Sequence, residues 1–336
     1  MDAISPAVIL VFAAAFYMAW NIGANDLANS MGDVVGARVL NLRQVILVAG
    51  CMTFLGAALF GSRVTTTIAE GIIPFSQIDQ HLATGGALAS LLAAGIWITI
   101  ATYFRLPVST SHSIVGAVLG FGLVAAKAGI IKFGDIAWII LLRIMFSWIL
   151  SPIAGMFLAF LVFTLIRRVL IERVRDVRRL EKIFGFLLIC SSCYIAFSLG
   201  TNDVANAAGS LSAALGKTGV QIPLWILVFS GFGIVLGIST WGYRVVETIG
   251  KRITELTPTR GFSADISAAT VVLVCSTFGL PVSTTHTLVG AIVGVGLARG
   301  LEAVNLAIIR RIVYAWLITV PVSTALAIII YLGFWG

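Results

Sequence analysis

Two short segments of this apolar chain place carboxylates where hydrocarbon is expected. "GANDLAN" spans residues 23–29 and returns as "GTNDVAN" at residues 200–206, with five identities in seven, so that Asp26 matches Asp203. An ionised aspartate at bilayer depth is costly unless it meets a cation, a proton or a water-filled cavity. Two such acids at matched positions therefore predict a cation site.

Asparagines stand on either side of each acid. Asn25 and Asn29 lie four residues apart, which places both amides on one face of a helix, and the second copy repeats this spacing. Gly23 and Gly200 precede the clusters, and we expect them to unwind the helix locally and expose backbone carbonyls. The candidate cation ligands are Asn25, Asp26, Asn29, Asn202, Asp203 and Asn206.

A second duplicated block is suited to binding an anion and not a cation. "LPVSTSHSIVG" at 106–116 returns as "LPVSTTHTLVG" at 280–290, with eight identities in eleven. Pro107 and Pro281 suit a first helical turn, where N–H groups lack intrahelical partners. Capping alone would explain one such block, but its duplication beside the Asn-Asp motifs favours an oxyanion site without Arg or Lys. The candidate hydroxyls are Ser109, Thr110, Ser111, Ser283, Thr284 and Thr285.

Further matched residues have more than one interpretation. His112 and His286 could relay protons, donate to an anion, or be held by neighbouring hydroxyls. Arg143 and Arg311 form a weaker matched pair near helix starts, and they could face the anion or extend toward lipid headgroups.

The composition defines the elements that must position these residues. Hydrophobic residues make up 59% of 336, charged residues 11%, and the mean hydropathy is +1.06. Apolar runs of membrane-spanning length recur along the chain and lack the alternation of barrel strands. We therefore predict an all-α integral membrane protein with about ten to twelve transmembrane or re-entrant helices.

The charge distribution divides the chain into two halves. Residues 167–182 carry seven Arg or Lys against three acids, which predicts a cytoplasmic linker at the lipid headgroups and not a nucleic-acid site. Neither chain end has this basic character, so an odd number of crossings per half would put both termini outside. Residues 1–166 and 183–336 would then be two inverted-topology repeats.

The paired "GANDLANS" and "GTNDVANA" segments, each with a prolyl Ser/Thr block, resemble the inorganic phosphate transporter (PiT) family of sodium-dependent phosphate symporters. The resemblance spans nearly the whole chain and implies a plasma-membrane homodimer that is not an enzyme and has no cofactor beyond coupling ions. It implies that Asn25, Asp26, Asn202 and Asp203 bind phosphate with the hydroxyls of the two blocks, and that the six acid and amide residues bind sodium. The chain departs from the family pattern at Leu27, where Val is common. Its central linker is also shorter than that of animal members.

The resemblance and charge arithmetic together suggest a mechanism. Phosphate and the two aspartates would repel each other, and two sodium ions held by carboxylate, amide and unwound carbonyl oxygens would remove that repulsion. Cation and anion would then bind with positive coupling. Two motif-bearing bundles would rock to give alternating access, with close helix contacts at the glycine-rich residues 116–122 and 290–296.

Several alternatives stay in view. The coupling ion could be the proton, and sulfate is an oxyanion of similar size. An intramembrane aspartyl protease would need two acids, yet it has no reason to surround each with asparagines. An anion channel would use the helix starts but has little use for paired carboxylates.

Overall fold

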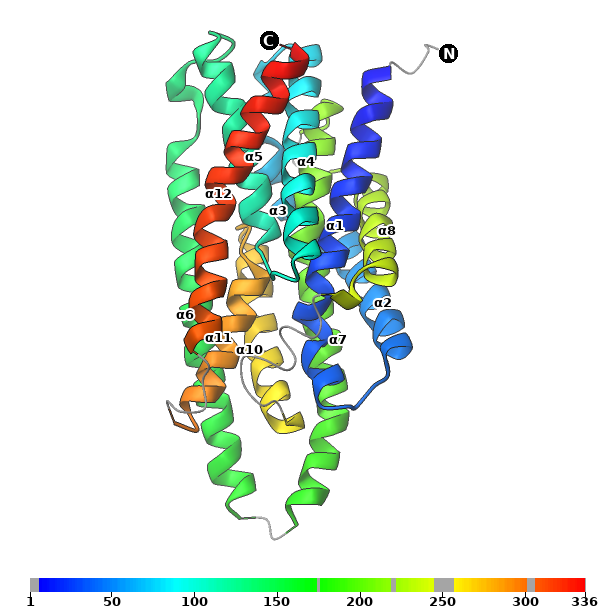
Figure 1. The fold of residues 1–336 in the computed structure, drawn as a ribbon, viewed down its shortest axis with the longest axis vertical. Helices are drawn as coiled ribbons and strands as arrows, with labels where there is room; N and C mark the ends of the chain where they lie inside the picture. The colour runs from blue at the N-terminus through cyan, green and yellow to red at the C-terminus, as the bar shows by residue number, and fades with distance from the viewer. Residues whose placement is uncertain (1–5, 174–175, 219–221, 245–256, 301–305, 336) are drawn as a thin grey trace.

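The computed structural model describes residues 6–173, 176–218, 222–244, 257–300 and 306–335. Every regular element in these ranges is a helix, as predicted, and the helices run along one long axis (Figure 1). The first half contains α1 (Pro6–Gly36), α2 (Leu42–Phe60), α3 (Ser62–Glu70), α4 (Gln80–Tyr103), α5 (Thr110–Lys127) and α6 (Trp138–Ile166). The second contains α7 (Val177–Ala214), α8 (Leu224–Thr240), α10 (Pro258–Thr277), α11 (Thr284–Leu297) and α12 (Leu306–Trp335).

The helices have the length and surface of a membrane protein. Among the described residues, seven helices are long and apolar enough to cross a bilayer. Large hydrophobic side chains cover the outside, and on α6 Ile139, Leu142 and Phe146 are each more than 60% exposed. Such a surface is stable only in lipid or against a partner. The prediction of an all-α integral membrane protein is therefore confirmed.

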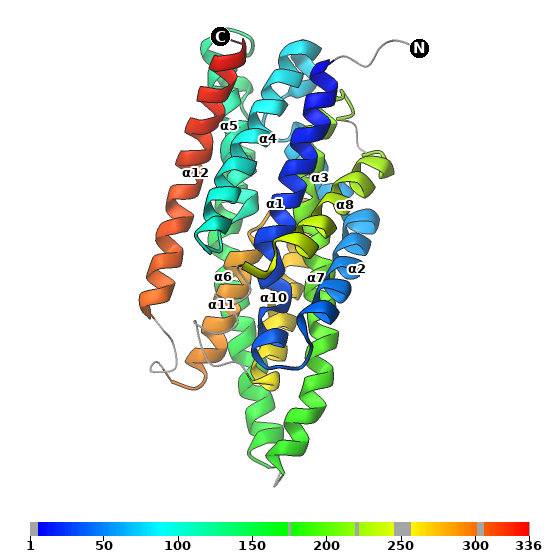
Figure 2. The ribbon, with the colours of Figure 1, turned by 45° about the vertical axis from the view of Figure 1, so that its right-hand side comes forward.

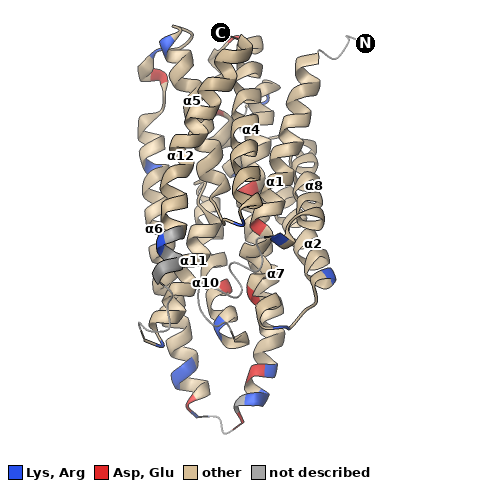
Figure 3. Ribbon diagram, in the orientation of Figure 1, with Lys and Arg blue, Asp and Glu red and all other residues tan. Residues whose placement is uncertain are grey.

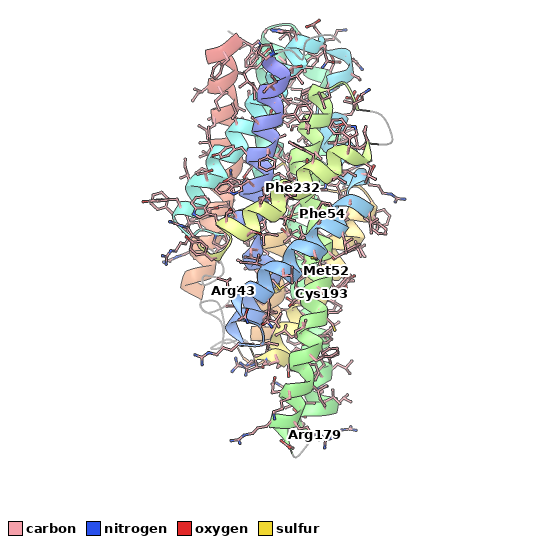
Figure 4. The ribbon with its side chains drawn as sticks, turned by 90° about the vertical axis from the view of Figure 1, so that its right-hand side faces the viewer. Arg43, Met52, Phe54, Arg179, Cys193 and Phe232 are labelled. Carbon is pink, nitrogen blue, oxygen red and sulfur yellow. The ribbon has the colours of Figure 1, made fainter. Side chains whose placement is uncertain are left out.

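The two halves run in opposite directions. Helix α1 begins and α12 ends at the same end of the molecule, whereas α6 and α7 approach each other at the opposite end (Figure 1). A π-helical turn, Arg167–Ile171, extends α6, and α7 begins at Val177, so much of the basic linker is helical. Lys and Arg residues, blue on the ribbon of Figure 3, gather at this end, and Arg179 lies at the tip of the molecule (Figure 4).

Two helical hairpins are re-entrant. The α4–α5 hairpin lies toward the end of the molecule where α12 ends, and the α10–α11 hairpin lies toward the opposite end (Figure 2). Their tips, residues 104–109 and 278–283, meet in the interior, where Val108 and Val282 are fully buried. The Ser111 hydroxyl donates to the Val282 carbonyl at 3.0 Å, and the Thr285 hydroxyl donates to the Val108 carbonyl at 3.2 Å. Two helix starts are therefore held inside the protein.

Glycines bring helices of opposite halves into backbone contact. A Cβ added at Gly23 would lie 1.9 Å from the carbonyl oxygen of Ile234 on α8, and one at Gly200 would lie 1.9 Å from that of Thr53 on α2. Helices α1 and α7 continue through both positions without a break. The predicted unwinding at Gly23 and Gly200 is therefore wrong, because the missing Cβ serves close helix crossing and not a change of backbone conformation. Figure 4 shows α2 crossing α7 obliquely, with Met52 and Phe54 on α2.

The glycine-rich segments of the hairpins have the same role, as predicted. A Cβ at Gly120 on α5 would lie 2.5 Å from the Thr324 carbonyl of α12. One at Gly294 on α11 would lie 2.0 Å from the Met156 carbonyl of α6. Each hairpin thus packs by its second helix against the last long helix of the other half.

Candidate functional site

The two predicted acids lie in one buried polar network at the centre of the molecule. Asp26 on α1 is 1% exposed and Asp203 on α7 is fully buried. Each accepts from a threonine hydroxyl at the start of a hairpin helix, and Thr110, which donates to Asp26, also accepts from Asn206, three residues after Asp203. The duplicated motifs therefore meet in one buried polar cluster, called the chamber below, as a paired cation site requires.

Asp26 is bound by donors from its own half. The Thr110 hydroxyl at the start of α5 donates to Asp26 Oδ2 at 3.0 Å, and the Asn29 amide donates to Oδ1 at 2.9 Å. The same amide donates to the Thr285 hydroxyl of α11 at 2.8 Å. Asn29 thereby connects the first acid to the hairpin of the second half.

Asp203 also accepts from a threonine and an asparagine, but from the other asparagine of its motif. The Thr284 hydroxyl donates to Asp203 Oδ2 at 3.1 Å, and the Asn202 amide donates to Oδ1 at 2.7 Å. Asn206 reaches the opposite hairpin, where its amide donates to the Thr110 hydroxyl at 3.3 Å and the Ser111 hydroxyl at 3.4 Å. Thr110 therefore contacts polar groups of both halves.

Asn25 and Asn202 hold the hairpin tips. The Asn25 amide donates to the Thr102 hydroxyl at 2.9 Å and the Leu106 carbonyl at 3.2 Å, and its oxygen accepts from the Val108 amide at 3.3 Å. Asn202 donates to the Val282 carbonyl at 2.8 Å and accepts from the amide of the same residue at 3.2 Å. These bonds satisfy backbone groups that have neither water nor a helix partner at this depth.

Ser109 and Ser283 are N-caps of the two hairpin helices. Their hydroxyls accept from the backbone amides of His112 at 3.2 Å and His286 at 3.1 Å. The helices begin one residue after each cap, so Pro107 and Pro281 lie two residues before the cap. The prediction that these prolines occupy the first helical turn is therefore wrong. A proline lacks an N–H, which suits an extended tip where a donor would be hard to satisfy.

Two amide oxygens of the chamber have no partner. Asn29 Oδ1 and Asn206 Oδ1 are buried and accept no hydrogen bond. The ion pair found among the described residues joins Arg167 to Glu172, so no arginine or lysine there neutralises either acid of the chamber. Two carboxylates and two unpaired amide oxygens form an oxygen-rich site that fits small hard cations such as sodium.

The same chamber offers donors to an anion. The N-termini of α5 and α11 meet there, and the first N–H groups of a helix have no intrahelical acceptor. Hydroxyls of Thr110, Ser111, Thr284 and Thr285 lie beside them, each at most 4% exposed. The two positive helix ends can hold an oxyanion while cations occupy the acid side. The four hydroxyls already donate to Asp26, Asp203 and the tip carbonyls, so they would turn toward an anion only by exchanging those bonds.

The two matched histidines form a stack with two tryptophans. The His112 and His286 ring centroids lie 4.4 Å apart, with Trp148 3.7 Å from His112 and Trp316 3.5 Å from His286. Both Nε2 atoms are buried without a hydrogen-bond partner. The Trp148 ring donates to the Pro281 carbonyl at 3.1 Å, so the stack ties α6 to the opposite hairpin tip. Ring contacts, and not hydroxyls, hold these histidines.

A second pair of buried acids was missed from the sequence. Asp33 on α1 and Asp265 on α10 face each other, and Asp265 Oδ2 accepts from the Ser192 hydroxyl at 2.7 Å and the Ser191 hydroxyl at 3.3 Å. Asp33 Oδ2 is buried without a partner. One signal was present, because Asp33 follows Asp26 by seven residues and so lies two turns along the same helix face.

The fold and the chamber define a multi-pass α-helical membrane transporter. Residues 22–327 match the model of the phosphate transporter family, and the chain belongs to that family. It is therefore a transport protein and not an enzyme.

Relatives extend the match over almost the whole chain. A protein of Pyrococcus abyssi described as a phosphate permease is 40% identical over 98% of both chains. The chloroplastic inorganic phosphate transporter 2-1 of Arabidopsis thaliana is 38% identical over 94% of this chain and 70% of its own. A solved structure, described as the sodium-dependent phosphate transporter, superposes with a TM-score of 0.89 at 37% identity, over 98% of this chain and 99% of the other.

Proposed function

We propose that this chain is a secondary active symporter that carries inorganic phosphate with sodium by alternating access. The observation that carries the proposal is the chamber, where paired carboxylates and unpaired amide oxygens lie beside two helix starts. A solved structure supports sodium as the coupling ion, because a protein 37% identical to this chain is described as the sodium-dependent phosphate transporter.

Sodium ions would occupy the acid side of the chamber. Asp26 and Asn29 would supply oxygens to one ion, and Asp203 and Asn206 to the other. The unpaired Asn29 and Asn206 oxygens support this assignment, since a buried acceptor without a partner is costly unless a ligand satisfies it. The uninterrupted α1 and α7 do not expose their carbonyls, so further oxygens would come from Thr110, Ser111, Thr284 and Thr285.

Phosphate would bind between the two hairpin helix starts. The donors would be the first N–H groups of α5 and α11 with the same four hydroxyls. Asp26 and Asp203 would reach the anion through the bound cations. Asn25, Asn202, Ser109 and Ser283, which we predicted as direct ligands, use their polar atoms to hold the tips and helix starts; their contact with phosphate stays a prediction.

Alternating access is supported by the paired arrangement of the two halves. Helix α1 packs on α8 as α7 packs on α2, and α5 packs on α12 as α11 packs on α6. Together with the reversed directions of the halves, this supports inverted repeats with a site at their junction. The homodimer, the plasma-membrane location, the cytoplasmic linker and the external termini stay predictions.

One transport experiment tests the coupling and the substrate together. Purified protein in liposomes should accumulate labelled phosphate when sodium is imposed outside, and should not do so when choline replaces sodium. Unlabelled phosphate should compete with the label and sulfate should not. Uptake driven equally well by a proton gradient without sodium would contradict sodium coupling, and equal competition by sulfate would contradict phosphate selectivity.

A further inference from the structure

A groove with two arginines in its wall borders the α10–α11 hairpin tip. It has a volume of about 630 Å³ and lies between α3, the first turns of α6 and residues 277–280 at the α10–α11 tip. Both α3 and the start of α6 lie toward the end that holds the start of α1 and the end of α12 (Figure 1). The groove therefore lies toward that end of the molecule and borders the outer side of the hairpin tip.

Arg143 and Arg63 line this groove, which we call the arginine groove. Arg143 on α6 is exposed and has no hydrogen-bond or ion-pair partner among the described residues. Arg63 on α3 donates from Nη1 to the Thr277 carbonyl at 2.6 Å, which leaves its other N–H groups without a partner in the described structure. The chemistry of both guanidinium groups suits a phosphate group.

The groove keeps a net positive charge. Glu70 also lines it, but its carboxylate accepts from the Ser76 amide at 3.2 Å and from the Ser76 hydroxyl. Two guanidinium groups against one carboxylate leave one positive charge. Thr66 and Thr67 add hydroxyls, and that of Thr67 already donates to the Gly279 carbonyl at 2.6 Å. A cleft of one sign with low-dielectric walls concentrates ions of the opposite sign.

The two arginines come from different helices of the groove wall. Arg143 is five residues after the start of α6, which is roughly 8 Å along the helix axis. Arg63 on α3 donates to the last carbonyl of α10, at the hairpin tip itself. In the same tip, the Val282 amide donates to Asn202 and the Thr284 hydroxyl donates to Asp203. Arg63 and the chamber are therefore connected to one hairpin tip.

We propose that the arginine groove, through Arg143 and Arg63, is an outer binding site for the phosphate group on its way to the buried chamber. This inference rests on the proposed function. The same guanidinium chemistry would bind an anionic lipid headgroup, so the test must separate free phosphate from lipid.

The test measures sodium-driven phosphate uptake in right-side-out and inside-out membrane vesicles from cells that lack other phosphate carriers. Arg143→Gln should raise the KM for phosphate about three- to tenfold at low ionic strength, in one vesicle orientation only, with the maximal rate unchanged. Arg143→Lys should restore most of the affinity, and added choline chloride should shrink the difference. Arg43→Gln is the matched control, because Arg43 is an exposed arginine on α2 that does not line the groove (Figure 4).

Lipid is separated from phosphate by reconstitution. The Arg143→Gln effect should persist in liposomes of neutral phosphatidylcholine alone; an effect that requires phosphatidylglycerol would overturn the inference in favour of a headgroup site. An unchanged KM in both orientations, or an equal rise in both, would also overturn it. Failure of the unmodified protein to show sodium-driven uptake would refute the proposed function instead, so the two failures are distinguishable.

Discussion

Arg63 and Arg244 stand in similar segments, "GSRV" at 61–64 and "GYRV" at 242–245, and each approaches one hairpin tip, but the two approaches differ. Arg63 hydrogen-bonds the Thr277 carbonyl at the α10–α11 tip and lies in an open polar groove. Arg244 instead lies over the rings of Tyr103, at the α4–α5 tip, and Trp241, at 5.6 and 5.4 Å from their centroids. One tip is thus reached by a polar groove, while aromatic rings cover the arginine at the other.

This difference teaches that related sequences need not produce related surroundings. At the core the two halves agree closely, since Asp26 and Asp203 each accept from a threonine hydroxyl and an asparagine amide. At the tips they diverge. The central site is thus similar in the two halves, while the surroundings of the two tips differ.

The largest effect should test the agreement at the core. If the proposed cation site is correct, Asp26→Asn and Asp203→Asn should each reduce sodium-driven phosphate uptake by about 100-fold or more, because each removes a charge that would hold a cation at bilayer depth. The measurement is initial uptake in proteoliposomes, normalised to the amount of reconstituted protein. Normal coupled uptake by either variant would contradict the assignment of that aspartate to the cation site.

The helix crossings test the agreement through stability. Gly23→Ala and Gly200→Ala should each destabilise the folded protein by about 1–3 kcal/mol, since the new Cβ meets a partner carbonyl. Thermal unfolding in detergent measures this loss. Gly134→Ala is the control, because a Cβ there has no neighbour within 4 Å. A melting temperature as high as that of the control would mean that the crossings are looser than they appear.

The two chamber asparagines sharpen the comparison. Asn29 donates to an acid and to the opposite hairpin, whereas Asn206 donates to two hydroxyls of the opposite hairpin. Asn29→Ala should therefore weaken sodium affinity by about tenfold, more than Asn206→Ala, because the Asn29 amide makes the shorter bonds, at 2.9 and 2.8 Å against 3.3 and 3.4 Å. The sodium dependence of phosphate uptake gives both values. An equal or reversed order would contradict the unequal roles.

The smallest effect concerns the contact of Arg244 with two aromatic rings. Arg244→Gln removes cation–π contacts with Tyr103 and Trp241, which are worth about 0.5–1 kcal/mol at exposed sites. We expect a two- to fivefold change in the phosphate KM in the vesicle orientation opposite to the one that Arg143→Gln affects. A change in the same orientation would mean that the two arginines serve one side of the membrane.

Much of the site was predictable because it depends on residue type and local spacing. A carboxylate at membrane depth requires compensation wherever the chain puts it, so Asp26 and Asp203 could be recognised from the duplicated motif alone. The hairpin helix starts were recognisable because proline and hydroxyl residues have position-specific backbone preferences. The role of Gly23 was misjudged, since a glycine that unwinds a helix and one that admits a neighbour have the same sequence.

The remainder depends on contacts between distant segments. Asn206 reaches Thr110 across 96 residues and Asn29 reaches Thr285 across 256, and no local pattern encodes those pairings. The Asp33–Asp265 pair and the joint position of Arg63 and Arg143 likewise appear only when α1 meets α10 and α3 approaches α6. The sequence by itself determined which charged and polar groups need a partner in a low-dielectric interior. The tertiary structure decided which partners satisfy them, because packing of whole helices, and not local preference, selects among the many donors and acceptors available.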